Sequence, residues 1–239
     1  MQPTNNHQMM GYDRSSTMFS PDGRLLQVEY AKKTVKQSPT SMGFVCKDGV
    51  LLLADKRILD KLMISESIEK VVPIDDHMGA SISGFSMDGR VLVERAQLLA
   101  QQHRLTYDGP MDILTLVKEV ANQKQAFTQY GGARPFGVSI LFAGVDDKGP
   151  QLYVTDVTGI YFSYRAVAIG EAETQLKEIL EKDYKDTITI EQAVKIGVKA
   201  MQTVFGSEFD MDRIDGAYIT SDEKKFKKLE KDYLRKLIK

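Results

Sequence analysis

The sequence predicts an α+β protein in which antiparallel sheets are stacked between layers of helices. Strand-like apolar runs occur in groups, an Asp-Gly turn joins the first two runs, and pairs of helical patterns separate the groups. This segregation differs from the regular strand–helix alternation of a parallel sheet. The 239 residues contain no Pro- or Gly-rich linker and no repeat of fixed period, so we expect a single domain.

A turn and a helix open the chain, and two pairs of strands follow. Ser20-Pro21-Asp22-Gly23 has the residue order of a type I turn, and weak apolar spacing predicts a helix over residues 24–36. Lys47-Asp48-Gly49 indicates a tight hairpin, because such turns need positive φ. Val50–Ala54 is apolar without alternation, which predicts a strand covered on both faces. The strands expected here are Ser41–Cys46, Val50–Ala54, Ile68–Ile74 and Ala80–Gly84.

Helices and strands recur in the rest of the chain. Gly109-Pro110 separates two amphipathic helices, and Thr189 with Gln192 has the capping-box spacing of a later helix. A final basic helix is predicted over residues 223–237, docked on its own domain, with a membrane-surface or calmodulin-type role as the alternative. The other elements expected are strands at Gly137–Gly144, Gln151–Val154, Tyr164–Ala168 and Ile214–Ile219, and helices around Glu171–Asp183 and Ile190–Phe205.

Composition and charge exclude several functional classes. The net charge of −1 gives no reason to expect a nucleic acid or an acidic membrane as partner. Cys46 is the single cysteine, which excludes an intrachain disulfide, and the three histidines have no Cys partners at metal-ligand spacing. No apolar run approaches the ~20 residues that span a bilayer, and the polar N-terminus lacks the apolar core of a signal peptide. We therefore expect a cytoplasmic protein that needs no cofactor or metal.

Three short motifs stand near the N-terminus. They are Gly11-Tyr12-Asp13-Arg14, Phe19-Ser20-Pro21-Asp22-Gly23-Arg24 and Val28-Glu29-Tyr30-Ala31. Together they resemble the α-type subunits of the 20S proteasome, and the resemblance extends to about Ile219. It implies the four-layer α-β-β-α sandwich of the N-terminal nucleophile hydrolase fold. It also implies seven-membered rings that cap rings of β-type subunits. The Thr128–Gly132 turn resembles the corresponding turn of archaeal members, which favours a ring of identical chains.

The same resemblance implies that catalysis is absent. Mature catalytic β-type subunits begin with a threonine whose free α-amino group serves as base for its own hydroxyl. Pro39 stands at that place in Pro39-Thr40-Ser41-Met42-Gly43, and the nitrogen of Thr40 is an amide whose lone pair is delocalised. Asp55 and Lys70 fall near the places of the β-type acidic and lysine partners, although we expect Asp55 to be a surface carboxylate. Two alternatives remain, an active hydrolase processed before Thr40 and a self-assembling structural ring.

Three residues match the pocket between adjacent subunits in which the family receives the C-terminal tail of a regulatory ATPase. Lys70 stands at the position of the lysine that binds the terminal carboxylate in a charge-assisted interaction. From spacing alone, an ordinary solvated lysine is the simpler interpretation, and the surrounding match reverses it. Phe85 and Ser38 stand where the family commonly has Leu and Gly, which leaves the specificity of the pocket open.

The resemblance also assigns a gate to the N-terminal part of the chain. Residues 1–11 would form a flexible segment that crowds a central pore, ahead of a single domain over residues 12–239; a frayed terminus is the alternative. The family cluster that holds the gate open is matched by Tyr12, Asp13, Pro21 and Tyr30. The plainer interpretation is that Pro21 serves only its turn and that Tyr30 only packs the first helix.

A glycine-containing turn matches the narrow channel entrance beneath the gate. Its residues are Tyr130, Gly131, Gly132, Ala133 and Arg134, and the paired glycines allow a sharp reversal. The resemblance thus implies four kinds of partner, namely copies of this chain, β-type subunits, a regulatory ATPase complex and unfolded proteins in transit.

Overall fold

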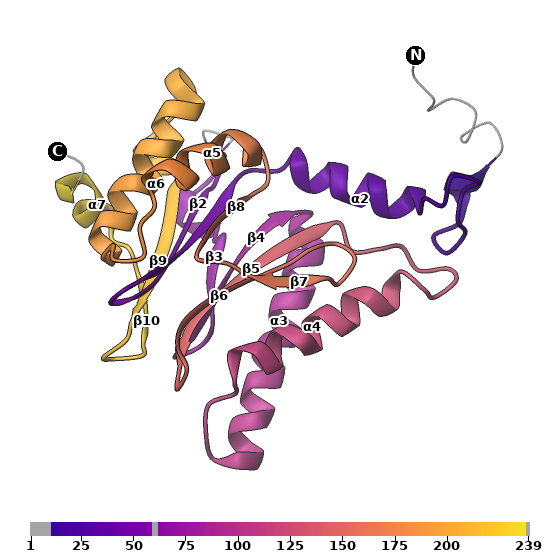
Figure 1. Ribbon diagram of the computed structural model, residues 1–239, viewed down its shortest axis with the longest axis horizontal. Coiled ribbons are helices and arrows are strands. Elements are labelled where there is room, and N and C mark those ends of the chain that lie inside the picture. Colours follow the sequence, from indigo (N-terminus) through magenta and orange to yellow (C-terminus); the bar gives the residue numbers. More distant parts are fainter. Residues whose placement is uncertain (1–10, 59–61, 238–239) are drawn as a thin grey trace.

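Two antiparallel sheets of five strands are stacked face to face, with helices on both outer faces (Figure 1). The computed structural model describes residues 11–58 and 62–237. Sheet I has the strand order β10-β9-β2-β1-β8, and sheet II has the order β3-β4-β5-β6-β7. The strands of sheet I are β1 (Ser41–Cys46), β2 (Gly49–Asp55), β8 (Ala166–Ile169), β9 (Ile214–Thr220) and β10 (Phe226–Lys228). The strands of sheet II are β3 (Val71–Asp75), β4 (Met78–Gly84), β5 (Val138–Asp146), β6 (Gly149–Thr155) and β7 (Tyr161–Ser163).

Strand β2 is buried along its whole length, as its unbroken apolar run predicts. Because successive side chains of a strand point to opposite faces, β2 contributes to two layers of the core. Leu51 and Leu53 pack outward among the helices that cover sheet I. Val50 and Leu52 point inward, to the apolar layer between the two sheets. The predicted hairpin is confirmed, with Cys46 paired to Gly49 across the turn.

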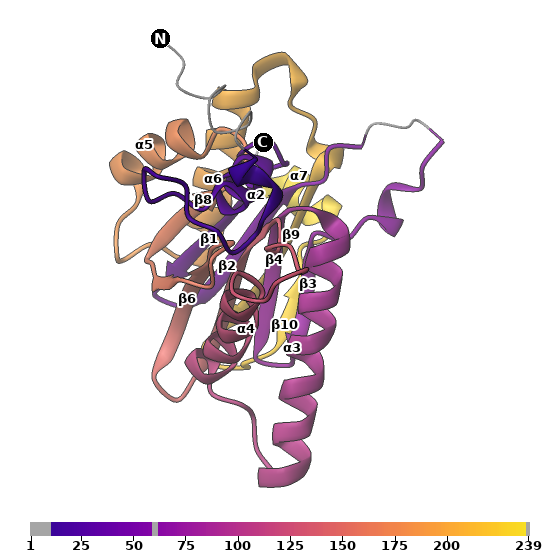
Figure 2. The ribbon, with the colours of Figure 1, turned by 90° about the vertical axis from the view of Figure 1, so that its right-hand side faces the viewer.

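Helices on both sides complete the predicted four-layer α-β-β-α sandwich, which is confirmed. Helices α3 (Ser86–Tyr107) and α4 (Ile113–Phe127) lie side by side on sheet II, and α5 (Glu173–Asp183), α6 (Ile190–Phe205) and α7 (Lys231–Leu237) cover sheet I (Figure 2). The capping box of α6, Thr189 with Gln192, is present as predicted. Short 3₁₀ helices also occur among the described residues, at η1 (Tyr12–Arg14), η2 (Ser65–Ser67), η3 (Gly206–Glu208) and η4 (Met211–Arg213). No helix in the described ranges is both long and apolar enough to cross a membrane.

The first long helix, α2 (Leu26–Lys36), starts two residues later than the predicted span of 24–36. Arg24 belongs to the preceding turn, because its amide donates to the Ser20 hydroxyl and its carbonyl accepts from the Ser20 amide. Helix α2 lies across one end of the sandwich, near β4 and β5 (Figure 1). Its buried side chains pack on Val157, so the helix is anchored to the loop that follows β6.

The predicted C-terminal helix over residues 223–237 is wrong in its first half. Residues 226–228 form β10, which pairs with β9 and extends sheet I, and α7 follows only from Lys231. Phe226 and Leu229 satisfied a helical spacing in the sequence, yet they pack in different layers. Phe226 packs against the inter-sheet cluster, whereas Leu229 joins the outer helical layer. The unpaired edge of β9 and the space over Gly79, where the Phe226 ring lies, override the local periodicity.

Candidate functional site

Three segments that are distant in sequence meet at one end of the sandwich, at the position predicted for the missing nucleophile. β1 begins just after Thr40, β3 begins just after Lys70, and β4 ends just before Phe85. The Nζ of Lys70 donates to the Pro39 carbonyl at 2.7 Å and to the Thr40 carbonyl at 3.2 Å. The Ser83 hydroxyl donates to the same Pro39 carbonyl at 2.9 Å. The structure therefore brings Lys70 to the nucleophile's position, where backbone carbonyls hold its amino group.

Thr40 has neither a base nor access to a substrate in this structure. Its side chain has no exposed surface, and its hydroxyl donates to the Glu171 carbonyl. Its own carbonyl accepts from the Asp55 amide at 3.0 Å, which fixes the residue beside β2. A nucleophilic hydroxyl needs an adjacent base and an open path to the scissile bond. The arrangement around Thr40 is thus that of a structural residue.

Lys70 is a buried lysine, so the solvated interpretation suggested by its spacing is wrong. It is 9% exposed. Burial lowers the pKa of Lys70 to about 7, with Asp55 and Asp215 raising it and Arg57 lowering it further. The Asp215 carboxylate also accepts the backbone amides of Lys70 and Val71, at 2.9 and 3.0 Å. The amino group consequently titrates near neutral pH, in reach of both an ionised and a neutral state.

Asp55 is not a surface carboxylate, and this expectation is corrected. Its exposed fraction is 4%, and both its oxygens accept from the Arg213 guanidinium, at 2.9 and 2.6 Å. The Arg57 amide donates to it as well, at 3.0 Å. Arg213 precedes β9 and is distant in sequence from Asp55, so no local pattern pointed to this pair. The bidentate geometry makes it a firm link between the ends of β2 and β9.

Ser38 and Phe85, the other two predicted pocket residues, lie near this end of the sandwich in different environments. Ser38 is buried, and its hydroxyl donates to the Val35 carbonyl at the end of α2 at 2.7 Å. Phe85 is 43% exposed and precedes the first turn of α3. Its amide donates to the Gly137 carbonyl at 2.9 Å. Of the predicted set, Phe85 therefore offers the most open apolar surface.

The predicted gate residues belong to one N-terminal unit that extends from the end of the sandwich (Figure 1). Tyr12 and Asp13 belong to η1, which α2 contacts, and the side-chain Nε2 of Gln27 donates to the Asp13 carbonyl. Pro21 is exposed in the turn before α2, and Tyr30 lies on the partly open face of that helix. The predicted gate segment, residues 1–11, lies outside the described residues except for Gly11.

Residues 130–134, which we name the channel turn, link α4 to β5 and are tied down at their C-terminal end. Both nitrogens of the Arg134 fork donate to the Asp88 carboxylate at 2.6 Å. Asp88 also accepts the Gly137 amide at 2.8 Å. Burial acts to raise the pKa of Asp88, but the hydrogen bonds from Arg134 and Gly137 outweigh it and the pKa is lowered. The sequence offered one weak signal for Asp88, an acidic residue in the first turn of a helix.

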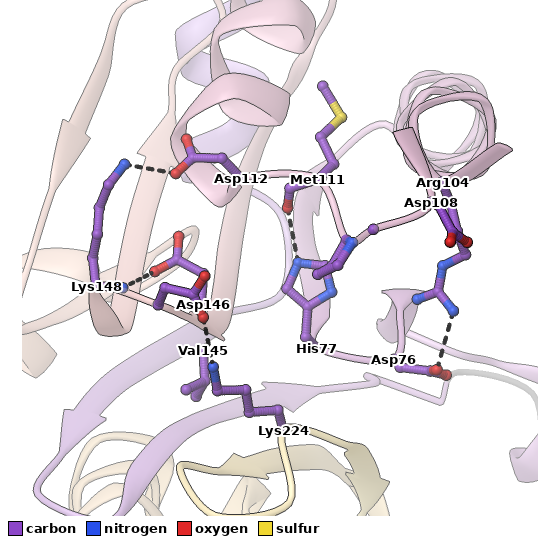
Figure 3. Close-up of a pocket in the computed structure, with 13 residues that line it drawn as sticks. Asp76, His77, Arg104, Asp108, Met111, Asp112, Val145, Asp146, Lys148 and Lys224 are labelled. Carbon is purple, nitrogen blue, oxygen red and sulfur yellow. Dashed lines mark hydrogen bonds and ion pairs between the residues drawn. The ribbon is translucent and has the colours of Figure 1, made fainter. Parts of the chain in front are cut away.

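A separate cavity of about 520 Å³ lies at the opposite end of the sandwich, among the turns that follow β3, β5 and β9 and the connection from α3 to α4. Figure 3 shows the side chains that line it. Its cations have carboxylate partners. Arg104 binds Asp75 at 2.7 Å, and Lys148 binds Asp112 at 2.6 Å. His77 contacts the Met111 carbonyl at 2.9 Å. No group of three or more potential ligands within the described ranges is placed to hold a metal ion, and the cavity contains none of the predicted site residues.

Comparisons with known proteins match nearly the whole chain. Residues 35–219 match the family model for proteasome subunits, and residues 12–33 match the N-terminal signature of the A-type proteasome subunits. The chain is 46% identical over 221 residues to the proteasome alpha subunit of Methanosarcina thermophila, covering 92% of this chain and 90% of the relative. It is 46% identical over 226 residues to that of Archaeoglobus fulgidus, covering 95% and 92%, and 47% identical over 228 residues to that of Pyrococcus abyssi, covering 95% and 87%.

The matched N-terminal signature covers η1, the turn before α2 and most of that helix. The larger match spans the strands and helices of both sheets through most of β9. Fold, motifs and relatives agree, and the chain belongs to the proteasome subunit family, within its α-type branch.

Proposed function

We propose that this chain is a noncatalytic outer-ring subunit that gates access to a proteolytic chamber and docks the C-terminal tails of a regulatory ATPase. The observation that carries the proposal is the replacement of the nucleophile. Pro39 stands at its position, and the Pro39 carbonyl is engaged by Lys70 and Ser83. A chain that has the α-type signature and a proline in place of the nucleophilic threonine is suited to assembly and gating. A neighbouring β-type subunit would cut the peptides.

The proposed assembly is a seven-membered ring of identical chains that caps a ring of β-type subunits in the cytoplasm. Unfolded proteins would pass through it, and neither nucleic acid nor a membrane is a proposed partner. The channel turn would surround the pore, and the unit that carries Tyr12, Asp13, Pro21 and Tyr30 would hold residues 1–11 clear of it. Support comes from the exposed position of Pro21 and from the anchoring of η1 to α2 through Gln27.

Lys70 is suited to receive a terminal carboxylate because, among the described residues, only two of its three N–H donors are used by backbone carbonyls. An ammonium has three N–H donors, and the carbonyls of Pro39 and Thr40 accept two of them. A carboxylate that enters beside the exposed Phe85 ring would take the third and favour the charged form of Lys70. Hydrophobic contact at Phe85 and a charge-assisted bond at Lys70 together describe a pocket for a chain terminus with an apolar residue near its end.

The first test concerns catalysis by the chain alone. We expect the purified chain to hydrolyse no fluorogenic peptide, because the Thr40 nitrogen is an amide and its hydroxyl is buried. Turnover that a threonine-directed inhibitor blocks, together with an N-terminus at Thr40, would establish the active hydrolase instead. A ring in negative-stain images that neither binds β-type subunits nor changes their activity would favour the structural ring.

The second test replaces Lys70 with Met, which keeps most of the side-chain volume and removes the charge. In particles reconstituted with β-type subunits, we expect Lys70→Met to abolish stimulation by the ATPase while basal peptide hydrolysis is retained. Loss of one partner of a desolvated charge pair costs about 2–5 kcal/mol. The measurement is peptide hydrolysis at rising ATPase concentration. Lys124→Met, a substitution at a buried lysine on α4, is the matched control. An unchanged response of the Lys70 variant would mean that tails dock elsewhere.

A further inference from the structure

Asp88 closes a three-way contact that joins the start of α3, the channel turn and the start of β5. We name this contact the clasp; it consists of the Asp88 carboxylate, the Arg134 guanidinium and the Gly137 amide. Both carboxylate oxygens are used, at 2.6 Å to each nitrogen of the Arg134 fork and 2.8 Å to the Gly137 nitrogen. Asp88 is buried, whereas the Arg134 side chain is half exposed. A bidentate pair with a third donor fixes orientation as well as position.

The channel turn has little else to hold it in place. Cβ atoms built at Gly131 and Gly132 would meet no atom within 4 Å, so the turn projects into open space. At its start, the Tyr130 amide donates to the Ala126 carbonyl of α4 at 3.2 Å, although the Tyr130 side chain is exposed. The Ala133 amide bonds within the turn, to the Tyr130 carbonyl at 3.3 Å. Among the described residues, Arg134 is the side chain of this turn that hydrogen-bonds the body of the domain. Paired glycines resist bending weakly, so the position of the turn depends on the clasp.

The clasp also touches the proposed docking pocket. The Arg134 guanidinium lies 5.8 Å from the centre of the Phe85 ring, a cation–π contact. The same ring covers Gly137, where an added Cβ would stand 2.7 Å from the ring carbon Cδ2. Phe85 immediately precedes α3, and the Asp88 amide in the first turn of that helix donates to the Phe85 carbonyl at 3.1 Å. One guanidinium therefore contacts both the pocket residue and the carboxylate that holds the turn.

From this geometry we propose that Asp88 is a positioning residue, which holds the channel turn and thereby sets how readily an unfolded chain passes the ring. This inference rests on the proposed function, because the turn must line a channel. In a ring, every copy contributes one turn to the same aperture, so loosening the clasp acts at every position around the pore. A short peptide needs little of the aperture, whereas a long unfolded chain must thread it throughout transit.

The experiment uses particles reconstituted with β-type subunits. Residues 1–11 are deleted from the wild-type reference and from every variant, so that the gate segment does not contribute, and full-length wild-type particles test the deletion itself. Asp88→Asn keeps the shape and an acceptor for Gly137 but loses the charge. Arg134→Lys keeps the charge but loses the fork. We expect each variant to raise the ratio of denatured-protein turnover to tetrapeptide turnover by about threefold or more. The turnover ratio of the double variant should be no higher than that of either single variant, because both substitutions remove the same contact.

Arg90→Gln is the control, because it breaks the exposed Arg90–Glu94 pair on the same helix and should leave the ratio unchanged. An unchanged ratio in the clasp variants, or additive effects of the two, would overturn the proposal. Should a variant fail to assemble, hydrogen exchange of the unassembled chain decides. Faster exchange confined to residues 130–137 supports the clasp, and unchanged exchange there refutes it. If the deletion itself does not speed peptide hydrolysis relative to full-length particles, the proposed gate role of residues 1–11 is refuted, whereas the proposal for the clasp is not.

Discussion

Among the residues that the structure describes, two lysines are buried, and each is held by backbone oxygen. Lys70 serves the proposed docking pocket. Lys124, on α4, has no exposed surface, and its Nζ donates to the carbonyl and the hydroxyl of Thr155, both at 3.0 Å. Burial lowers the pKa of Lys124 to about 7, and Asp156 opposes the shift. Lys124 continues the apolar stripe of α4, four residues after Val120. Lys70 lies in a polar segment, where a lysine is ordinarily solvated.

At the scale of the residue, Lys124 should make stability depend on pH. Its pKa is about 7 in the folded chain and near the ordinary value of 10.5 when unfolded. Between these two pKa values the unfolded chain binds more protons than the folded chain, so the free energy of unfolding increases as pH rises from 7. Below pH 7 both states are protonated, and the full cost of burying the charged Lys124 is present. Relative to Lys124→Met, the wild-type chain should gain at most about 1.4 kcal/mol per pH unit.

Urea unfolding of the unassembled chain at pH 7, 8 and 9, at one protein concentration, measures this difference. Lys177→Met, at an exposed lysine on α5, is the control for the loss of one positive charge. A constant difference between wild type and Lys124→Met across this range would mean that Lys124 keeps its ordinary pKa.

At the scale of the element, the C-terminal segment belongs to the core. β10 extends sheet I, and Leu234 of α7 is almost fully buried among the helices of the outer layer. Tyr233, on the same helix, is an exposed aromatic residue. A docked α7 agrees with the predicted association with its own domain, although the segment before it is a strand. The membrane-surface alternative would require that buried face to be released.

Phe226→Ala should destabilise the chain, because the ring packs on the inter-sheet cluster and fills the space over Gly79. We expect a loss of about 2 kcal/mol in the free energy of unfolding, below the value for a fully buried phenylalanine because Phe226 is partly exposed. Denaturant unfolding measures it, and Tyr233→Ala serves as the matched control with a change near zero. Equal losses for both variants would contradict the packing described for β10.

At the scale of the whole molecule, the sandwich separates two kinds of end. One end carries Pro39 and Thr40, the buried Lys70, the clasp and α2, and the other carries turns with paired charges (Figures 1 and 3). Burial and hydrogen bonding at the first end leave no reactive group exposed among the described residues of the nucleophile position. In the proposed ring, this subunit controls the entry of substrate chains and does not cleave them at this site.

Deletion of residues 1–11 should speed the hydrolysis of small peptides in reconstituted particles while assembly is retained. The physical reason is that a segment without periodic pattern, repeated around a pore, obstructs it by crowding. Peptide hydrolysis by full-length and truncated particles of equal mass, checked by gel filtration, is the measurement. Equal rates would mean that this segment is not a gate.

Local patterns in the sequence were sufficient for the hairpin before β2, the capping box of α6 and the α-type motifs, because each depends on residues close together in the chain. The four-layer sandwich followed from the family resemblance that those motifs carry. Tertiary structure alone decided the burial of Lys70, the strand β10, and the pairs that join Asp55 to Arg213 and Asp88 to Arg134. Those features bring together residues that are distant in sequence, and periodicity carries no information about which distant groups meet. A buried charge is stable only where such partners converge, and their convergence is a property of the packed layers.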